Sequence, residues 1–409
     1  MLAVAAGNAP APAANGVPTY ADEIARLMQR RCVDCHHPGG IGPFSLLTYR
    51  QTEGRAEMIK EVVMQRRMPP WHADPHVGKF KNDRRLTDAE IETLVRWIDN
   101  GRPMGNEADL PDPVKYSEDW RIPTPDAVFE LPEEQHIEPS GVVPYFEFEV
   151  PTNFTEDKWL QMLEARPSNP SVVHHIIVFV RSPEMKSGER EDFERIGRGF
   201  LVGFAPGVIP TILPDGYAVR VPKGSSFIFQ MHYTTTGKRE VDRSQFGMVF
   251  AKRPPQHEMV TATTINTDFQ IPAGDPNFRV VADSVLPDDA VLYSMTPHTH
   301  YRGKSIEYIA HYPDGRSTTL LRVPQYDFNW QTTYILETPT RLPKGTRIET
   351  IAHFDNSAAN KANPDPATPV RWGDQTWEEM MIGWMNISWE SASLPVNSGA
   401  GGATGAGAR

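Results

Sequence analysis

The sequence predicts a multidomain chain in which a small all-α domain is followed by two all-β sandwich domains of a jelly-roll-like kind. The chain has 409 residues, enough for roughly two to four domains of about 100–200 residues each. Helical spacing is confined to about residues 20–104, whereas short alternating strands such as YFEFEV and SSFIFQMHY begin after about residue 126. Turn sequences such as PDG and PKG separate these strands, as is typical of β-sandwiches.

Composition limits the partners and gives the predicted boundaries. The net charge of -11, without a lysine or arginine run, argues against nucleic acid as a partner. No stretch approaches the roughly 20 apolar residues of a transmembrane helix. We expect a signal remnant or linker at 1–19, the helical domain at 20–105, a linker at 106–125, sandwiches at 126–260 and 261–395, and a disordered tail at 396–409.

The only two cysteines, Cys32 and Cys35, are spaced C-x-x-C, and His36 follows them directly. Such a pair is a redox dithiol, half of a zinc site or a heme attachment. A structural zinc site needs further ligands at matching spacing, and no second C-x-x-C exists. The histidine favours heme, because both thiols can form thioethers to one heme while His36 reaches its iron. The motif therefore predicts one covalent heme c, with a dithiol as the alternative.

The segments around this motif resemble a small monoheme cytochrome c over about Tyr20 to Met104. Met68 lies in the proline-rich stretch RRMPPW, which is where such proteins hold the sixth iron ligand. His72 and His37 compete for that role, and Met68 could instead be a core methionine. Because thioether attachment of heme takes place outside the cytoplasm, the resemblance implies a periplasmic or secreted protein.

Histidines gather on the predicted strands. In H-T-H the strand period of two places His298 and His300 on one face, ready for a single metal ion. The adjacent His174 and His175 can face one metal only at a strand end or a bulge. Any one histidine alone is more simply a core or surface residue, but burying five of them without partners would be costly. With His232, the first pair completes one metal site, and the second pair needs a third ligand.

The order HH, Q-x-H-Y, H-T-H with G-K, and E-M resembles the type II copper, ascorbate-dependent monooxygenases, that is, the peptidylglycine α-hydroxylating and dopamine β-monooxygenases. The similarity covers about Val128 to Trp389 and includes ILPDGYAVRVPKGSSFIFQMHY, YDFNWQ and DQTWEEMMIGWMNIS. Imidazoles suit copper in both oxidation states, and a thioether favours Cu(I). The resemblance implies two coppers, one for electron transfer held by His174, His175 and His232, and one that activates dioxygen held by His298, His300 and Met380.

The chain departs from that family in places. Eukaryotic members are braced by disulfides, whereas both cysteines here belong to the heme motif. Thr296 stands where the peptide-hydroxylating enzymes have an arginine that holds the substrate carboxylate, and Ile382 and Trp384 replace their asparagine and tyrosine. Met381 stands where the family usually has cysteine, and Gln230 is either part of the electron path or an ordinary strand residue. The metal chemistry is therefore implied, and the peptide specificity is not.

Together these features predict an enzyme, a heme- and copper-dependent monooxygenase that uses dioxygen to hydroxylate a C–H bond of an unknown organic substrate. The fused heme part would receive electrons from an external donor and deliver them within one chain. The alternative is a non-enzymatic heme–copper electron-transfer or copper-binding protein. A third hypothesis places structural zinc in one histidine site, although zinc has no need of the Met380 thioether.

Overall fold

The computed structural model describes residues 16–114, 120–184, 199–205 and 208–390, of which 38% are in strands and 12% in helices. The chain divides into two compact units. A helical unit takes the described residues up to Trp71 and resumes at Arg84, and a β unit takes His72–Asp83 and the described residues from position 120 onward. No helix within these ranges is long and apolar enough to cross a membrane.

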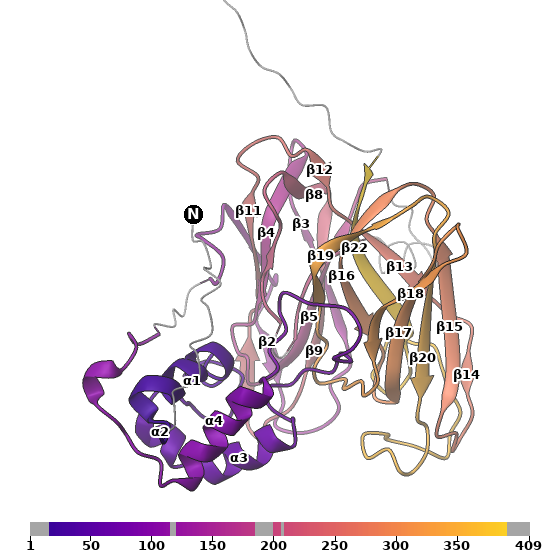
Figure 1. The fold of residues 1–409 in the computed structure, drawn as a ribbon. Helices are drawn as coiled ribbons and strands as arrows, with labels where there is room; N and C mark the ends of the chain where they lie inside the picture. The colour runs from indigo at the N-terminus through magenta and orange to yellow at the C-terminus, as the bar shows by residue number, and fades with distance from the viewer. Residues whose placement is uncertain (1–15, 115–119, 185–198, 206–207, 391–409) are drawn as a thin grey trace, which may run out of the picture. The chain divides into compact units, whose positions relative to one another are not determined.

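The helical unit packs short helices around an apolar core in which Leu94 and Trp97 are fully buried. Thr87 and Glu90 form the capping box that their spacing predicts, which satisfies backbone N–H groups at the start of the last helix. The elements are a π-helical turn Tyr20–Ile24, α1 Ala25–Arg31, α2 Tyr49–Glu53, α3 Ala56–Met64, α4 Asp88–Asp99 and a 3-10 turn Glu107–Asp109 (Figure 1).

Two sheets form the first half of the β unit. The first sheet has the order β1-β11-β4-β8-β12, with β7 paired to β4, and the second has the order β3-β9-β5-β6. All their pairs are antiparallel except β12 with β8. The first sheet contains β1 Ala127–Glu130, β4 Lys158–Arg166, β7 Thr211–Ile212, β8 Tyr217–Val221, β11 Gln245–Phe250 and β12 His257–Glu258. The second contains β3 Phe146–Pro151, β5 Val173–Arg181, β6 Phe200–Phe204 and β9 Ser226–Tyr233.

Two further sheets form the second half. The third sheet has the order β13-β22-β16-β19 and the fourth the order β15-β20-β17-β18, and all their pairs are antiparallel. Their strands are β13 Val260–Ile265, β15 Phe278–Val285, β16 Ala290–His298, β17 Gly303–His311, β18 Ser317–Val323, β19 Tyr334–Leu342, β20 Arg347–Phe354 and β22 Ile382–Trp389. Two small pairs complete the unit, β2 Gln135–Ile137 with β10 Glu240–Asp242, and β14 Gln270–Ile271 with β21 Val370–Arg371.

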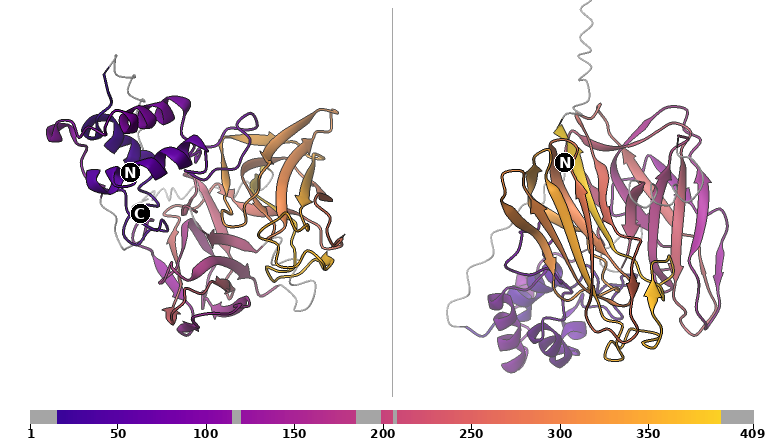
Figure 2. Two further views of the ribbon diagram at one scale, coloured as in Figure 1. Left: turned by 90° about the horizontal axis from the view of Figure 1, so that it is seen from below. Right: turned by 90° about the vertical axis from the view of Figure 1, so that its right-hand side faces the viewer.

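The larger sheets pack face to face, as Figure 2 shows for the two halves of the β unit. One apolar core joins the first and second sheets and includes Leu163 and Phe229. Thr264 and Thr350 hydrogen-bond through their hydroxyl oxygens between the third and fourth sheets, 2.6 Å apart. The burial of sheet faces against neighbouring sheets is consistent with β-sandwich packing.

A separate apolar cluster joins the second and third sheets. Because side chains alternate along a strand, β9 turns Phe227 and Phe229 toward the first sheet and Ile228 toward the third. His232, which is four residues beyond Ile228, shares its face. The cluster consists of Ile177, Phe179, Ile228, Met380, Ile382 and Trp384.

The segment His72–Asp83, called the strap here, pairs with the third sheet. Phe80 forms an antiparallel bridge with Leu336, and its ring packs against Tyr334 with centroids 5.4 Å apart. The Lys81 N–H donates to the Ile335 carbonyl at 2.8 Å. The strap therefore belongs to the β unit, although the helices before and after it do not.

The predicted fold class, an all-α cytochrome c domain followed by two jelly-roll-like sandwiches, is wrong. The described residues form a mainly β structure whose four larger sheets stand like the blades of a propeller, without a separate all-α cytochrome c domain. The helices are short, and the strap interrupts the helical unit. Helical spacing reports local amphipathicity only, so it could not reveal that residues inside the predicted helical domain pair with a strand far along the chain.

Candidate functional site

Three histidines converge at the ends of two neighbouring strands of the second sheet. His175 on β5 pairs with His232 on β9, and the register shifts between Val173 and His175. His174 and His175 are adjacent, so they can face one metal ion only at a strand end or a bulge. The irregularity at His174 meets this requirement, because it turns the His174 ring to the side that His175 also faces. The metal-ligating atoms of His174, His175 and His232 all lie within 4.8 Å of one another.

The spacing within this all-histidine cluster suits a metal ion. The Nδ1 atoms of His174 and His175 are 3.4 Å apart, and those of His174 and His232 are 3.3 Å apart. Nitrogens bound about 2.0–2.1 Å from one ion at tetrahedral angles lie about 3.3 Å apart. Burial, reinforced by the neighbouring His174, lowers the pKa of His232 to about 3. The imidazoles are therefore neutral at pH 7, which is the form that binds metals.

The H-T-H pair forms a second cluster where β16 ends. The rings of His298 and His300 have centroids 5.2 Å apart and planes 89° apart. His298 Nδ1 lies 2.7 Å from the side-chain oxygen of Gln331, and His300 Nδ1 lies 3.3 Å from the backbone carbonyl of Glu378. As these oxygens accept from Nδ1–H, each ring keeps its Nε2 lone pair for a ligand.

Burial makes this second pair neutral as well. Burial lowers the pKa of His298 to about 4, and it lowers the pKa of His300 well below the usual value for histidine. The Nε2 atom of His300 is buried without a hydrogen-bond partner among the described residues. A buried, neutral ring nitrogen without a hydrogen-bond partner has its lone pair available for a metal ion.

Met380 lies beside this pair. Ile382 on β22 is the register partner of His298, so Met380 precedes the paired residue by two positions. Cross-strand partners share a face, which places His298 on the face of Ile382, where Met380 and Trp384 also pack. Met380 is 5% exposed, and the ring of Trp384 lies 5.4 Å from that of His298. The structure thus brings Met380 into the apolar surroundings of the H-T-H pair.

Glu379, directly before Met380, is a residue that our sequence reasoning missed. It is fully buried, and its carboxylate accepts hydrogen bonds from the backbone N–H groups of His300 at 2.8 Å and Arg302 at 2.6 Å. Burial raises the pKa of this carboxyl to about 8. No signal in a single sequence separates such a glutamate from the surface acids around it, since burial depends on the tertiary fold.

Two aromatic side chains link the two clusters. The ring of Phe328 stacks on His174, with centroids 4.9 Å apart and planes 14° apart, and contacts His300 edge-on at 5.9 Å. Tyr145 lies 4.6 Å from His232 and 6.4 Å from His300, also between ring centroids. A single layer of aromatic rings therefore separates the imidazoles of one cluster from those of the other.

The positions that replace the family's peptide clamp are already engaged. The Thr296 hydroxyl oxygen lies 2.9 Å from that of Thr333, and Ile382 and Trp384 are buried. Arg302, which could have rebuilt a clamp, is 2% exposed and donates to the Asn356 side chain and the Trp377 carbonyl. Gln230, beside His232, is buried and donates to Glu147 at 3.2 Å, so its amide is held in place.

The C-x-x-C-H turn follows α1 in the helical unit. Cys32 and Cys35 are not joined in a disulfide, and the His36 N–H donates to the Cys32 carbonyl at 3.0 Å. His36 Nδ1 lies 3.0 Å from the Phe44 carbonyl, which leaves Nε2 available as a ligand. Burial, reinforced by Cys35, raises the pKa of Cys32 to about 12. A redox dithiol needs a lowered thiol pKa, so this environment does not favour that alternative.

The candidates for the sixth iron ligand are spread over both units. Met68 lies on the loop after α3, with 36% of its surface exposed and outside the apolar core. His37 is partly exposed, with its Nδ1 2.8 Å from the Pro38 carbonyl. His72 belongs to the strap, where burial lowers its pKa and the charge of Asp327 opposes that shift.

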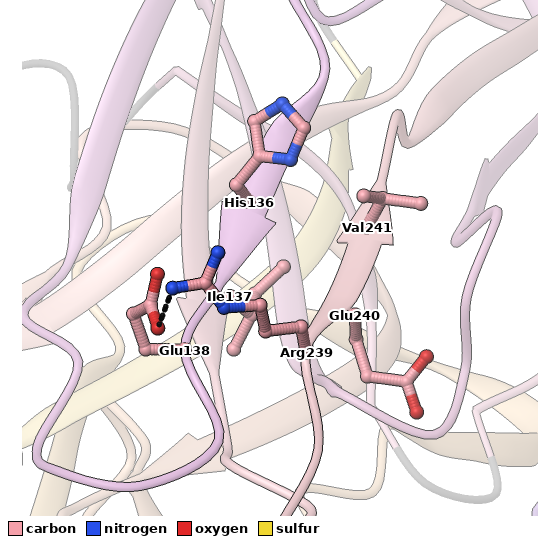
Figure 3. Close-up of a pocket in the computed structure, with 6 residues that line it drawn as sticks. All are labelled: His136, Ile137, Glu138, Arg239, Glu240 and Val241. Carbon is pink, nitrogen blue, oxygen red and sulfur yellow. Dashed lines mark ion pairs between the residues drawn. The ribbon is translucent and has the colours of Figure 1, made fainter.

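A shallow hollow lies apart from both clusters (Figure 3). It is formed by β2 and β10 with the residues beside them, and Arg239 pairs with Glu138 across it at 3.3 Å. No histidine of either cluster lines it. The lining residues are His136, Ile137, Glu138, Arg239, Glu240 and Val241.

Comparison with known proteins assigns no family to this chain. No family model matches the sequence, and no curated protein matches it. Among solved structures, the chain is similar to PNGF-II, at 10% identity and a TM-score of 0.29, over 64% of this chain and 65% of that one. It is also similar to the major capsid protein P2 of bacteriophage PM2, at 11% identity and a TM-score of 0.25, over 66% of this chain and 99% of that one. At these TM-scores neither likeness bears on what this chain does.

Proposed function

We propose that this chain is a heme- and copper-dependent monooxygenase, periplasmic or secreted, that hydroxylates a C–H bond of an organic substrate. The observation that carries the proposal is the pair of buried imidazole clusters, each with neutral rings, separated by one layer of aromatic side chains. The order of the motifs, which resembles that of the type II copper monooxygenases, supports the same function.

The donor atoms fit copper. His174, His175 and His232 would hold one ion, and His298, His300 and Met380 the other. Neutral imidazoles suit both oxidation states of copper, and a thioether favours Cu(I). When bound, copper supplies electron storage and the activation of dioxygen. Each turnover converts R–H, dioxygen, two electrons and two protons into R–OH and water, so an external one-electron donor must reduce the protein.

The chain's own residues prepare this site. Gln331 and the Glu378 carbonyl fix the rotation of the His298 and His300 rings and keep Nε2 unprotonated. Phe328 and Tyr145 pack against the His300 ring and would limit the access of water to it. Buried apolar side chains on β22 suit a substrate of low polarity. These residues bind, orient and dehydrate, which are the contributions that a protein makes to metal chemistry.

The heme motif fits a covalently bound heme. Cys32 and Cys35 would form the thioethers, and His36 would ligate the iron through Nε2, which its hydrogen bond to the Phe44 carbonyl leaves free. When bound, the heme supplies one-electron transfer. We propose Met68 for the sixth position because its loop leaves the side chain accessible.

A non-enzymatic heme–copper electron carrier is the second candidate. It is favoured by the burial of His175, His298 and His300, each at most 3% exposed, since electrons need no access for a substrate. Dioxygen consumption separates the two functions. The reduced, copper-loaded protein should consume dioxygen and form product if it is a monooxygenase, and should only exchange electrons if it is a carrier.

We expect two coppers per chain after reconstitution, and His232→Ala should retain one. The substitution removes a ring whose Nδ1 lies 3.3 Å from the Nδ1 of His174 but leaves the H-T-H pair and its Gln331 contact intact. Elemental analysis after gel filtration measures the ratio. His257→Ala is a matched control on the first sheet, away from both clusters, and should keep two. Loss of both ions from the His232 variant would disprove independent sites.

Glycine-extended peptides are expected to be poor substrates. Thr296 cannot replace a bidentate arginine–carboxylate contact, whose loss costs a few kcal/mol, or about a hundredfold or more in affinity. Arg302 is committed to Asn356 and Trp377 and is not free to take that role. Product analysis with such a peptide and with an amide-capped, less polar analogue measures the preference. Efficient hydroxylation of the peptide carboxylate form would contradict this prediction.

A further inference from the structure

We propose that Glu379 is the positioning residue of the second cluster, whose carboxylate ties the H-T-H turn to the methionine segment and so sets His300 against Met380. This inference rests on the proposed function, because it concerns the copper site of His298, His300 and Met380. Glu379 is not itself proposed as a ligand. Its role is to hold two pieces of chain, far apart in sequence, at the separation that one ion requires.

The carboxylate of Glu379 binds both ends of the turn that follows β16. One oxygen accepts from the His300 N–H at 2.8 Å, and the other accepts from the Arg302 N–H at 2.6 Å. The turn is closed by a hydrogen bond from the Gly303 N–H to the His300 carbonyl at 3.0 Å. A single buried side chain therefore fixes the backbone on both sides of Tyr301.

Hydrogen bonds also fix the backbone around Glu379. The Glu379 N–H donates to the Arg371 carbonyl, and the Glu379 carbonyl accepts from the Gly373 N–H, both at 3.1 Å. Trp372 and Glu379 form a parallel bridge. Glu379 is thus anchored to one segment by its backbone and to another by its carboxylate, and Met380 is the next residue along the chain.

The preceding residue adds a second contact to the same histidine. The Glu378 carbonyl lies 3.3 Å from His300 Nδ1. This contact sets the rotation of the ring, whereas the Glu379 carboxylate sets the position of the backbone that carries it. Together they place the free Nε2 of His300 in a defined direction relative to Met380.

Glu164 provides a matched control within the β unit. It is also a buried glutamate, and it accepts hydrogen bonds from the backbone N–H groups of Arg121 at 2.8 Å and Ile122 at 3.1 Å. It lies on β4 of the first sheet, away from both histidine clusters. Both amides donate to the same oxygen of Glu164, so E164Q can keep these two bonds, whereas Glu379 uses both oxygens and E379Q must lose one. E164Q therefore controls for the replacement of a buried carboxylate as such.

The test compares E379Q, E164Q and the unmodified full-length protein after loading with copper. We expect E379Q to weaken copper binding at the second cluster about 10–100-fold and to lose or lengthen the copper–sulfur distance seen by X-ray absorption, while the all-histidine cluster keeps its ion. E164Q should change neither reading. Should E379Q fail to fold, Glu379→Asp retains a carboxyl group but shortens its reach to the two amides, and should show the same metal defect.

Normal copper affinity and unchanged sulfur scattering in a folded Glu379 variant would overturn this inference and leave the proposed function standing. An equal metal defect in E164Q would also overturn it, because the effect would then follow from the loss of any buried carboxylate in the β unit. If the unmodified protein showed no copper–sulfur scattering, the proposed function would fail first, and the positioning role of Glu379 with it.

Discussion

Replacing His298 by alanine is expected to abolish dioxygen-dependent turnover of the copper-loaded protein. The His298 ring is 3% exposed, and Gln331 holds its Nδ1 at 2.7 Å, so one nitrogen is directed to the proposed copper site. Loss of a direct ligand should exceed the 10–100-fold loss that changes to outer-shell partners cause. Dioxygen uptake by the reduced protein, with product analysis, measures the effect.

His311→Ala is the control for this experiment. His311 lies on β17, where its ring contacts Ser317 and Glu349 and neither cluster. This variant should consume dioxygen at the rate of the unmodified protein, and chemical reduction of the heme should be the same in both variants. If the His298 variant consumed dioxygen at an unchanged rate, the second cluster would not be the oxygen-activating site.

Replacing Cys32 and Cys35 together by serine is expected to remove all covalently bound heme. The unmodified protein should keep its heme through acid–acetone extraction, because thioether bonds survive unfolding whereas coordinate bonds do not. The double variant should contain no protein-bound heme in a denaturing gel stained for peroxidase activity. This would be a complete loss, the largest effect expected in the helical unit.

His37→Ala provides the matched comparison. His37 directly follows the motif and is partly exposed. Its Nδ1 lies near the Pro38 carbonyl, whereas that of His36 lies near the Phe44 carbonyl. We expect this variant to retain the full amount of covalent heme. Release of heme into the organic phase from the unmodified protein would refute thioether attachment at this turn.

Local features of the fold were predictable because their causes are local. Thr87 and Glu90 are three residues apart, and the capping box they predict is the one that forms. The condition placed on the adjacent pair His174 and His175, a strand end or a bulge, follows from the alternation of side chains along a strand, and a register shift is found there. Strand period and capping chemistry need no knowledge of the rest of the chain.

The fold class was not predictable in the same way. The stretch after Met68 reads as a proline-rich loop of a helical domain, but its residues from His72 to Asp83 pair with the third sheet. Asn82 and Thr333, which hydrogen-bond at 2.7 Å, are 251 residues apart. The periodicity of a short stretch of sequence cannot identify a pairing partner at that distance. The segment was therefore assigned to the helical domain, whereas it belongs to the β unit.

The sequence by itself determined which donor atoms the chain can offer to metals: two thiols and an imidazole within one turn, and five histidines and a methionine in or beside apolar segments. Residue identity and strand period decide this without any long-range contact. Only the tertiary structure decided that Phe328 lies against His174 and His300, and that Glu379 holds the His300 backbone from 79 residues away. Such contacts depend on which sheet faces pack together. Burial and hydrogen bonding between distant segments arise from the whole fold, so a short stretch of sequence does not reveal them.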